Sequence, residues 1–257
     1  MSKIALITGA TSGIGWATAV RLAHEGFDLI LCGRRAERLA ELEKIVSASS
    51  DKSAGNVKVR LLTFDVRDRK AVEAAIGSLP VEWQAIDCLV NNAGNAHGLA
   101  PIQEGDPDDW DAMLDSNVKG LLYVSKAVMP GMVARQSGHI VNLGSIAGKE
   151  TYPNGNVYCA SKAAVQAITD GMRLDLNPHG IKVTGIHPGM VDTEFSKVRF
   201  KGDEQRADSV YKGLQPLTAD DIADTIAFVL TRPPHVVLAD IVLYPVAQAS
   251  ATVVKRG

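Results

Sequence analysis

Short apolar runs alternate with amphipathic stretches along most of the 257-residue chain. The apolar runs carry hydrophobic side chains at consecutive positions, which predicts strands that are buried on both faces. The stretches between them space their apolar residues three or four positions apart, as in a helix with one buried face. The predicted strands cover residues 3–8, 28–32, 57–64, 86–90, 139–143, 182–186 and 237–243, and the predicted helices cover residues 13–24, 36–48, 68–79, 107–133, 157–176 and 219–230.

This alternation predicts an α/β fold with one doubly wound domain over residues 1–257. Its seven-stranded parallel sheet would be covered by helices on both faces. One stretch breaks the alternation, because residues 189–215 are rich in charge and follow a strand late in the chain. Ligands of such folds bind at the carboxyl ends of the strands, so we expect this stretch to form a substrate-binding lid. The alternative is a solvated surface insertion.

Composition and charge narrow the classes of function. The formal net charge is -2, with 27 Lys and Arg against 29 Asp and Glu, whereas nucleic-acid and membrane-surface binders usually carry a basic face. We therefore expect neither nucleic acid nor membrane as a partner. The start of the chain has no signal-peptide pattern. Three widely spaced cysteines, Cys32, Cys88 and Cys159, predict free thiols in a reducing, cytoplasmic compartment and no metal site.

A glycine-rich turn with the spacing GxxxGxG follows the first predicted strand. Glycines in such a turn allow positive φ angles and close approach of a diphosphate, and the next helix offers free N–H groups to the anion. Glycine-rich turns also occur for structural reasons alone. We expect these turn residues to bind a nucleotide: Gly9, Thr11, Ser12, Gly13, Ile14 and Gly15.

The end of the second predicted strand indicates which dinucleotide is preferred. Sites for NAD generally place a carboxylate there for the ribose 2′-hydroxyl, whereas arginine accommodates the 2′-phosphate of NADP. This strand ends at Arg34 and Arg35, and their guanidinium groups can form bidentate, charge-assisted hydrogen bonds to a phosphate. We therefore expect NADP(H) as the cofactor. The alternative is that both arginines merely begin a charged helix.

Tyr158 and Lys162 share one face of a predicted helix because they lie four positions apart. An ordinary phenol is ionised to only about one part in a thousand at neutral pH, and a nearby ammonium favours the ionised form. Tyr158 could then take a proton from an alcohol or return one to a carbonyl oxygen. Ser145 ends the preceding strand, where its hydroxyl could bind a substrate oxygen or simply cap the next turn.

Asparagines and small residues follow another predicted strand. Asn91, Asn92, Ala93 and Gly94 end the strand at 86–90, where small residues let the backbone approach a ligand. Asn117 lies on the long predicted helix. It would be either a buried polar residue that bends this helix or part of a proton relay.

Together these motifs resemble those of the short-chain dehydrogenase/reductase family over essentially the whole chain. The resemblance rests on the following elements in order: the turn at 8–15, Asp65 with Val66, the Asn91 to Gly94 segment, Asn117, Ser145, Tyr158 with Lys162, and the Pro188, Gly189, Val191 and Thr193 segment. It implies a Rossmann fold and an enzyme that moves a hydride between NADP(H) and a carbon bearing a hydroxyl or carbonyl group.

The resemblance also implies a role for each catalytic residue. Tyr158 would be the acid/base, and Lys162 would lower its pKa and hold the nicotinamide ribose. Ser145 would bind the substrate oxygen. Asn117 would hold a water that links Lys162 to solvent.

Other motifs would hold the cofactor and the subunits. The resemblance implies that Asp65 and Val66 flank the adenine and that the segment from Pro188 to Thr193 holds the nicotinamide amide. Family members are commonly tetramers, so we expect a homotetramer. The predicted strand at 237–243 would otherwise be an unprotected apolar edge.

Residues 33–39, 79–83 and 193–203 resemble the NADP-dependent 3-hydroxy acid dehydrogenase branch of this family. Members of this branch oxidise serine, allo-threonine and 3-hydroxyisobutyrate, or reduce malonic semialdehyde. The resemblance implies a small hydroxy acid substrate, although Cys159 departs from the Gly or Ser that often follows the tyrosine. In the lid, Arg199 and Lys201 could clamp the substrate carboxylate; alternatively, both cations face solvent or pair with Glu194 and Asp203.

Two other functions stay open. A carbonyl or 3-oxoacyl-thioester reductase would use the same scaffold. A protein that senses NADP without chemistry would belong to a different class, and it could dispense with Tyr158 or Lys162, both of which are present.

Overall fold

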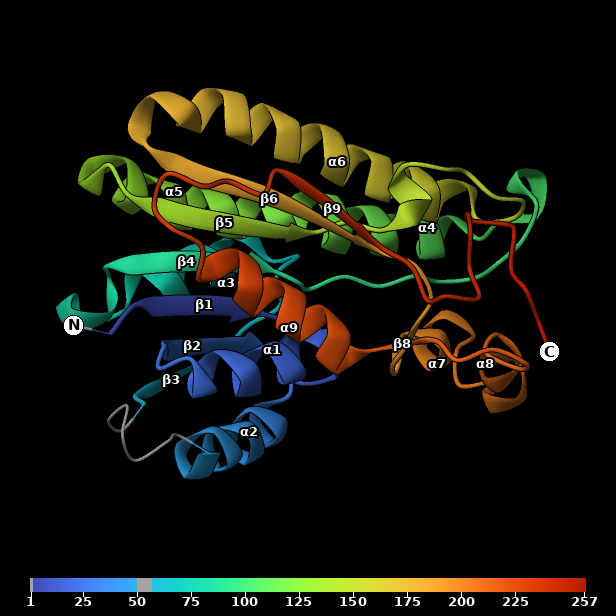
Figure 1. Ribbon diagram of the computed structural model, residues 1–257, viewed down its shortest axis with the longest axis horizontal. Helices are drawn as coiled ribbons and strands as arrows, with labels where there is room; N and C mark the ends of the chain where they lie inside the picture. Colours follow the sequence, from blue (N-terminus) through green and yellow to red (C-terminus); the bar gives the residue numbers. More distant parts are fainter. Residues whose placement is uncertain (1, 50–56) are drawn as a thin grey trace.

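The structure is a computed structural model that describes residues 2–49 and 57–257. In this part of the chain, seven parallel strands form one sheet in the order β3-β2-β1-β4-β5-β6-β9 (Figure 1). They are β1 (Ile4–Thr8), β2 (Asp28–Gly33), β3 (Val59–Thr63), β4 (Ile86–Asn91), β5 (Gly138–Leu143), β6 (Ile181–Pro188) and β9 (Asp240–Leu243). The predicted α/β fold with a seven-stranded parallel sheet is confirmed.

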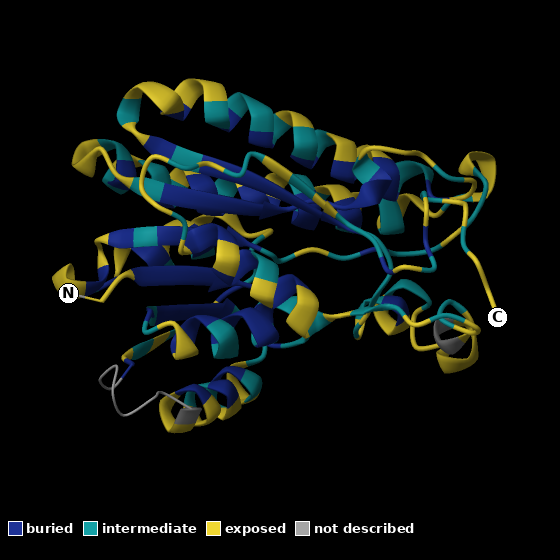
Figure 2. Cartoon of the chain, in the orientation of Figure 1, coloured by how far each residue is buried: buried dark blue, intermediate teal, exposed yellow. Residues whose placement is uncertain are grey.

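Helices cover both faces of this sheet and bury its inner strands (Figure 2), whereas the edge strands β3 and β9 are partly exposed. One face carries α1 (Gly13–His24), α2 (Ala36–Ser49) and α9 (Ala219–Leu230), and the other carries α3 (Arg69–Gly77), α4 (Pro107–Leu114), α5 (Leu121–Arg135) and α6 (Asn156–Leu176). Within β1, Ala5 and Ile7 pack into the first core while Ile4 and Leu6 pack into the second. The inner strands therefore need apolar side chains at consecutive positions.

The long helix predicted at 107–133 is interrupted. The helical run extends from α4 through a π-helical turn, η3 (Asp115–Gly120), into α5, which ends at Arg135. Asn117 lies in this turn. Such turns are frequent at functional sites, and the surrounding apolar spacing does not reveal them.

The last strand is shorter than the predicted range of 237–243. Residue Ala239 still accepts a hydrogen bond from the backbone N–H of Gly185 at 2.9 Å, but the ladder with β6 starts at Asp240. β9 lies at the edge of the described sheet, as predicted for an edge strand.

The charged stretch at 189–215 folds into short elements beyond the carboxyl ends of the strands (Figure 1). They are β7 (Val191–Asp192), α7 (Phe195–Arg199) and α8 (Glu204–Ser209), and β7 pairs with β8 (Leu217–Thr218). The C-terminal segment holds both ends of this stretch. Gln248 accepts a hydrogen bond from the N–H of Met190 at 2.8 Å, and Gly257 donates one to Gly213 at 2.9 Å.

Two glycines give a matched test of backbone packing. A Cβ atom at Gly15 would overlap the carbonyl oxygen of Gly9 and lie 2.5 Å from Nδ2 of Asn92, whereas one at Gly171 would meet nothing within 4 Å. We expect Gly15→Ala to lower the free energy of unfolding by about 1–3 kcal/mol. Gly171→Ala should raise it by about 0.4–1 kcal/mol because alanine stiffens the unfolded chain. Urea unfolding measures both, and a Gly15→Ala protein as stable as the wild type would contradict this packing.

Candidate active site

Helix α6 carries Tyr158 and Lys162, both buried, against the end of β5. The Lys162 ammonium donates a hydrogen bond to the carbonyl oxygen of Leu143, the last residue of β5, at 2.9 Å. Burial lowers the pKa of Lys162 to about 8. The structure therefore places the predicted Tyr/Lys pair at the carboxyl edge of the sheet, where parallel folds bind their ligands.

Ser145 lies two residues beyond β5 and makes two contacts. Its hydroxyl oxygen accepts a hydrogen bond from the N–H of Ala147 at 3.1 Å and so caps the short helix η4 (Ile146–Gly148). Its side chain also acts on Tyr158, whose pKa it lowers. Ser145 thus caps a turn and faces the phenol at the same time.

The pKa of Tyr158 moves in the direction opposite to the sequence-based expectation. Burial raises this pKa above its usual value, and the nearby Tyr152 adds to the effect. The side chain of Ser145 and the positive charge of Arg199 oppose it. Desolvation of the phenolate outweighs these favourable contacts because the ring lies within the core of the site. Tyr158 is therefore a protonated phenol at neutral pH in this structure.

The side chain of Asn117 is fully engaged by protein groups. Its Oδ1 atom accepts hydrogen bonds from the N–H of Asn95 at 2.8 Å and the hydroxyl of Ser116 at 3.0 Å. Its Nδ2 group donates to the carbonyl of Asn95 at 2.9 Å and to Ser161 at 3.0 Å. An amide has two acceptor and two donor positions, so this side chain cannot also hold the expected relay water. Such a water would have to bind the main chain.

The glycine-rich turn joins β1 to α1 and has the geometry of an anion site. Gly9 and Gly13 have φ angles of +66° and +52°, which other residues rarely adopt. Ser12 is the N-cap residue of α1 and makes no side-chain capping bond, so the first N–H groups of this helix face outward for a ligand. Thr11 binds Arg35, while Ile14 packs against the core.

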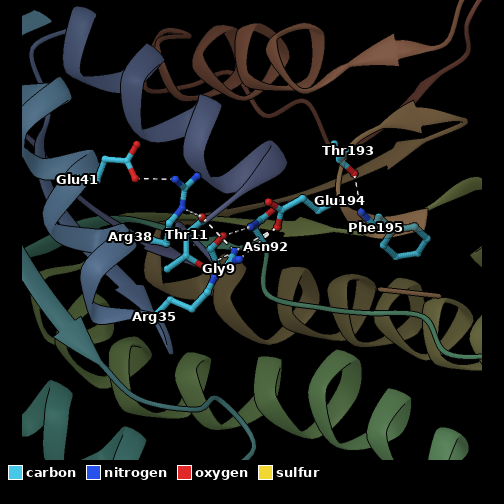
Figure 3. Close-up of polar contacts among 9 residues, drawn as sticks. All are labelled: Gly9, Thr11, Arg35, Arg38, Glu41, Asn92, Thr193, Glu194 and Phe195. Atoms are coloured by element: carbon cyan, nitrogen blue, oxygen red, sulfur yellow. Dashed lines mark hydrogen bonds and ion pairs between the residues drawn. The ribbon is translucent and has the colours of Figure 1, made fainter. Parts of the chain in front are cut away.

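Asn92, Ala93 and Gly94 lie at the site, whereas the Asn91 side chain lies in the core. Asn92 donates hydrogen bonds to the carbonyls of Thr8 and Gly9, and so braces the glycine turn (Figure 3). The backbone N–H of Ala93 donates to the Thr8 hydroxyl at 3.0 Å. A Cβ atom at Gly94 would lie 2.9 Å from Oδ1 of Asn117, so Gly94 leaves room for the Asn117 amide.

The side chain of Asn91, a predicted cofactor ligand, points elsewhere. It is buried and donates to Ser125 and Asn142, each at 2.9 Å. The structure therefore places the Asn91 side chain in a polar network between β4 and β5, away from the cofactor groove.

Arginines gather beside the turn at the end of β2. Arg35 donates to the hydroxyl and carbonyl oxygens of Thr11, each at 3.1 Å, and lies 3.3 Å from Glu194 (Figure 3). Arg38, which the sequence reasoning missed, donates to the same carbonyl at 3.4 Å. It follows Arg35 by three residues, and this helical spacing was the available signal. Arg34 is 68% exposed and lies 3.8 Å from Asp65.

The remaining predicted cofactor residues lie on several elements around the glycine turn and the ends of β2 and β6. Burial acts to raise the pKa of Asp65, but hydrogen bonds and charge from Arg67 and charge from Arg34 hold it below its usual value. Gly13 faces Thr193, since a Cβ atom at Gly13 would lie 3.3 Å from Cβ of Thr193. The other members occupy neighbouring positions: Val66 against the π-helical turn, Pro188 at the end of β6, Gly189 next to Gln248, and Val191 in β7.

A pocket of about 140 Å³ opens beside Tyr158. Arg199, on α7, lines it, and its guanidinium lies 5.6 Å from the ring centre of Tyr152 and 5.5 Å from that of Tyr158. Its Nε group donates to the carbonyl of Gly98 at 3.2 Å. Its Nη2 group is buried and makes no hydrogen bond within the described part of the chain. An unpartnered buried cationic donor is costly.

The structure separates the two cations of the predicted clamp. Lys201 is 58% exposed and pairs with Asp109 at 3.0 Å and Asp106 at 3.5 Å. These acids line the pocket, whereas Lys201 does not. The positive charge of Lys201 therefore offsets the two acidic groups at the pocket wall. Of the two cations in the predicted clamp, Arg199 lines the pocket and Lys201 does not.

Several pocket residues were not predicted from the sequence. His97 and Trp110 line the pocket, and Phe195 packs on Tyr158 with ring centroids 5.6 Å apart. His97 follows Gly94 by three residues, which was a weak signal. Tyr152 reaches the site only through the fold of the loop that precedes α6.

The described residues, 2–49 and 57–257, contain no cluster of three or more His, Cys, Asp or Glu side chains that could hold a metal ion. No helix among them is long and apolar enough to span a membrane.

Comparison with known proteins adds independent information. Residues 3–204 match the family model described as short chain dehydrogenase. The NADP-dependent 3-hydroxy acid dehydrogenase YdfG of Salmonella typhi is 45% identical over 249 residues, which cover 96% of this chain and 97% of the relative. Sulfoacetaldehyde reductase 2 of Chromohalobacter salexigens is 46% identical over 258 residues, which cover 100% of both chains.

Among solved structures, the closed form of serine dehydrogenase complexed with NADP⁺ superimposes with a TM-score of 0.91. It is 43% identical, and the match covers 96% of this chain and 97% of that chain. The relatives therefore match the chain almost end to end.

The lowered pKa of Lys162 predicts a pH-dependent stability. Between the pKa of about 8 in the folded protein and the ordinary value of 10.5, the unfolded chain binds a proton at this position that the folded chain lacks. Stability therefore rises with pH in this window and is lost as the pH falls toward 8. Relative to Lys162→Met, the wild type should gain up to about 1.4 kcal/mol per pH unit between pH 8 and 10. Denaturant unfolding at several pH values measures this gain, and a constant difference would contradict the buried ammonium.

Proposed function

The chain belongs to the short chain dehydrogenase family, and we propose that it transfers a hydride between NADP(H) and a small 3-hydroxy acid or the matching 3-oxo acid or semialdehyde. One observation carries this proposal. Tyr158 and Arg199 line the same pocket, and the buried Nη2 group of Arg199 makes no hydrogen bond within the described part of the chain. An acid/base and an anion receptor side by side suit a substrate with both a hydroxyl and an acid group.

The cofactor groove fits NADP(H). The outward N–H groups at the start of α1 suit a diphosphate, and Arg34, Arg35 and Arg38 suit a 2′-phosphate. Glu194 now pairs with Arg35, but both groups are exposed, so exchanging this partner for a phosphate costs little. The similarity to NADP-dependent relatives supports the same cofactor. When bound, NADPH supplies the hydride.

The protein's own groups manage the proton and the substrate. Tyr158, protonated at neutral pH, donates its phenolic proton to the carbonyl oxygen in the reductive direction. Ser145 accepts from Ala147, and its hydroxyl hydrogen, which acts on Tyr158 in this structure, would turn to the same substrate oxygen. In oxidation Tyr158 must first lose its proton to solvent, and the positive charges of Lys162 and Arg199 stabilise the resulting phenolate. This phenolate then takes up the alcohol proton and becomes a phenol again.

Pocket size and charge bear on the alternative functions. A cavity of about 150 Å³ holds a molecule of about six heavy atoms such as benzene, so 140 Å³ suits a small acid. A 3-oxoacyl thioester on a carrier would need more room. An uncharged carbonyl substrate would leave Arg199 unpartnered, and a protein that only senses NADP would not need Tyr158, Ser145 and Lys162 together.

The lid, domain and assembly belong to the same proposal. Residues 189–215 would act as the lid within one domain of residues 1–257, since α7 brings both Phe195 and Arg199 to Tyr158. A homotetramer would cover edge strand β9, where Val242 is 41% exposed. Light scattering on the purified protein tests the assembly, and a monomer would contradict it.

A substrate panel with two matched variants tests the function. Serine, 3-hydroxyisobutyrate, 3-hydroxybutyrate, isethionate and 2-propanol are oxidised with NADP⁺ or NAD⁺ while absorbance at 340 nm is followed. We expect the 3-hydroxy acids with NADP⁺ to be preferred. Arg199→Ala should raise KM for the acids by about 10- to 100-fold because it removes a hydrogen bond to a charged group, with a smaller effect on 2-propanol. Lys201→Ala is the control and should change this KM by less than about threefold.

The panel also distinguishes the alternatives. Equal effects of Arg199→Ala on the acids and on 2-propanol would contradict the role of Arg199. A preference for isethionate would make the substrate a sulfonate, and no turnover with any substrate would contradict the enzyme function.

A further inference from the structure

A wholly buried histidine lies behind Ser145, and the proposed chemistry does not use it. His187 is next to last in β6, and its ring fills the space left by two glycines. A Cβ atom at Gly144 would overlap the ring, and one at Gly185 would lie 2.6 Å from its Nε2. The ring therefore packs directly against the backbone that leads into Ser145.

The carboxylate of Asp240 contacts this ring from the far side. Nε2 of His187 lies 2.7 Å from Oδ1 of Asp240, which stands opposite Gly185 in the ladder between β6 and β9. The other oxygen of Asp240 accepts a hydrogen bond from Lys149 at 2.7 Å. Lys149 also donates to Gln166 on α6 at 3.2 Å. Lys149 thus holds the carboxylate that faces the ring, and Gln166 on α6 holds Lys149.

The ring also reaches the catalytic strand end. The ring lies directly behind the strand end that leads into Ser145, and neither of its nitrogens has a hydrogen-bond partner within the described part of the chain. Burial, aided by the positive charge of Lys149, lowers the pKa of His187 to about 4, although Asp240 and the backbone of Ser145 oppose this effect. The ring is therefore neutral near pH 7 and acts through packing.

We propose that His187 and Asp240 are positioning residues that keep the Ser145 hydroxyl directed at the reacting oxygen. The inference rests on the proposed function, in which Ser145 binds that oxygen. Gly144 has no side chain with which to anchor the turn, so the turn depends on the ring behind it. Displacement of a reacting group by about 1 Å can cost about 100-fold in rate.

Variants at these two positions test the inference. We expect His187→Ala to lower kcat by about 10- to 100-fold, with the dissociation constant for NADPH and the KM for the acid changed by less than about twofold. His187→Asn refills part of the space beside Gly144, so it should recover part of this loss. Asp240→Asn should lower kcat by several-fold, whereas Asp175→Asn, at an exposed carboxylate on α6, should leave it unchanged.

A double-variant cycle separates positioning from general structural damage. If His187 acts through Ser145, His187→Ala should lower kcat by less than about twofold in a Ser145→Ala background. The same loss in both backgrounds, or an unchanged kcat in His187→Ala, would overturn the inference.

Hydrogen–deuterium exchange gives a readout that does not need turnover. His187→Ala and Asp240→Asn should speed amide exchange at residues 144–149, while Asp175→Asn should not. Unchanged exchange would overturn the inference. A wild type without turnover on the substrate panel would contradict the proposed function instead, so the two failures are distinguishable.

Discussion

The buried ammonium of Lys162 is the constraint around which the site is arranged. Lowering its pKa from 10.5 to about 8 corresponds to roughly 3 kcal/mol in favour of the neutral form. The carbonyl of Leu143 at the end of β5 is its hydrogen-bond acceptor. Helix α6 must therefore lie against this strand end. This placement brings Tyr158, one turn earlier on α6, next to Ser145, two residues beyond Leu143.

The residues around this ammonium are arranged by close packing and by burial of their polar groups. Gly94 leaves room for the Asn117 amide, and Gly144 leaves room for the ring of His187 behind Ser145. The same low-dielectric surroundings raise the pKa of Tyr158 and leave Arg199 with an unpartnered donor. Both effects favour a substrate that accepts a proton at one end and carries a negative charge at the other.

The sequence predicted the sheet and the placement of Tyr158 and Lys162 on one helix because both depend on local signals. Consecutive apolar positions defined the strands, and the spacing of Tyr158 and Lys162 placed both side chains on one helical face. The π-helical turn at Asn117 escaped prediction because its apolar spacing is that of an ordinary helix. The inward direction of Asn91 also escaped, since its amide pairs with Ser125 and Asn142 from distant segments.

Charge relationships between distant segments were the least predictable part. The sequence identified Arg199 and Lys201 as a possible clamp, but only the fold shows that Asp106 and Asp109 engage Lys201. The raised pKa of Tyr158 likewise depends on burial, whereas the sequence showed only the nearby ammonium. The pairing of His187 with Asp240 requires the register of β6 and β9, which no local pattern encodes.

The central claim is that Tyr158 exchanges the proton while a hydride passes between NADP(H) and the substrate carbon. Its most direct test uses Tyr158→Phe, with a 3-hydroxy acid deuterated at the hydroxyl-bearing carbon and NADP⁺. The account predicts that the wild type yields NADPH carrying deuterium, as measured by mass spectrometry. The variant should bind NADPH with wild-type affinity but lose at least about 1000-fold in turnover. NADPH without deuterium, or a variant with near wild-type turnover, would contradict it.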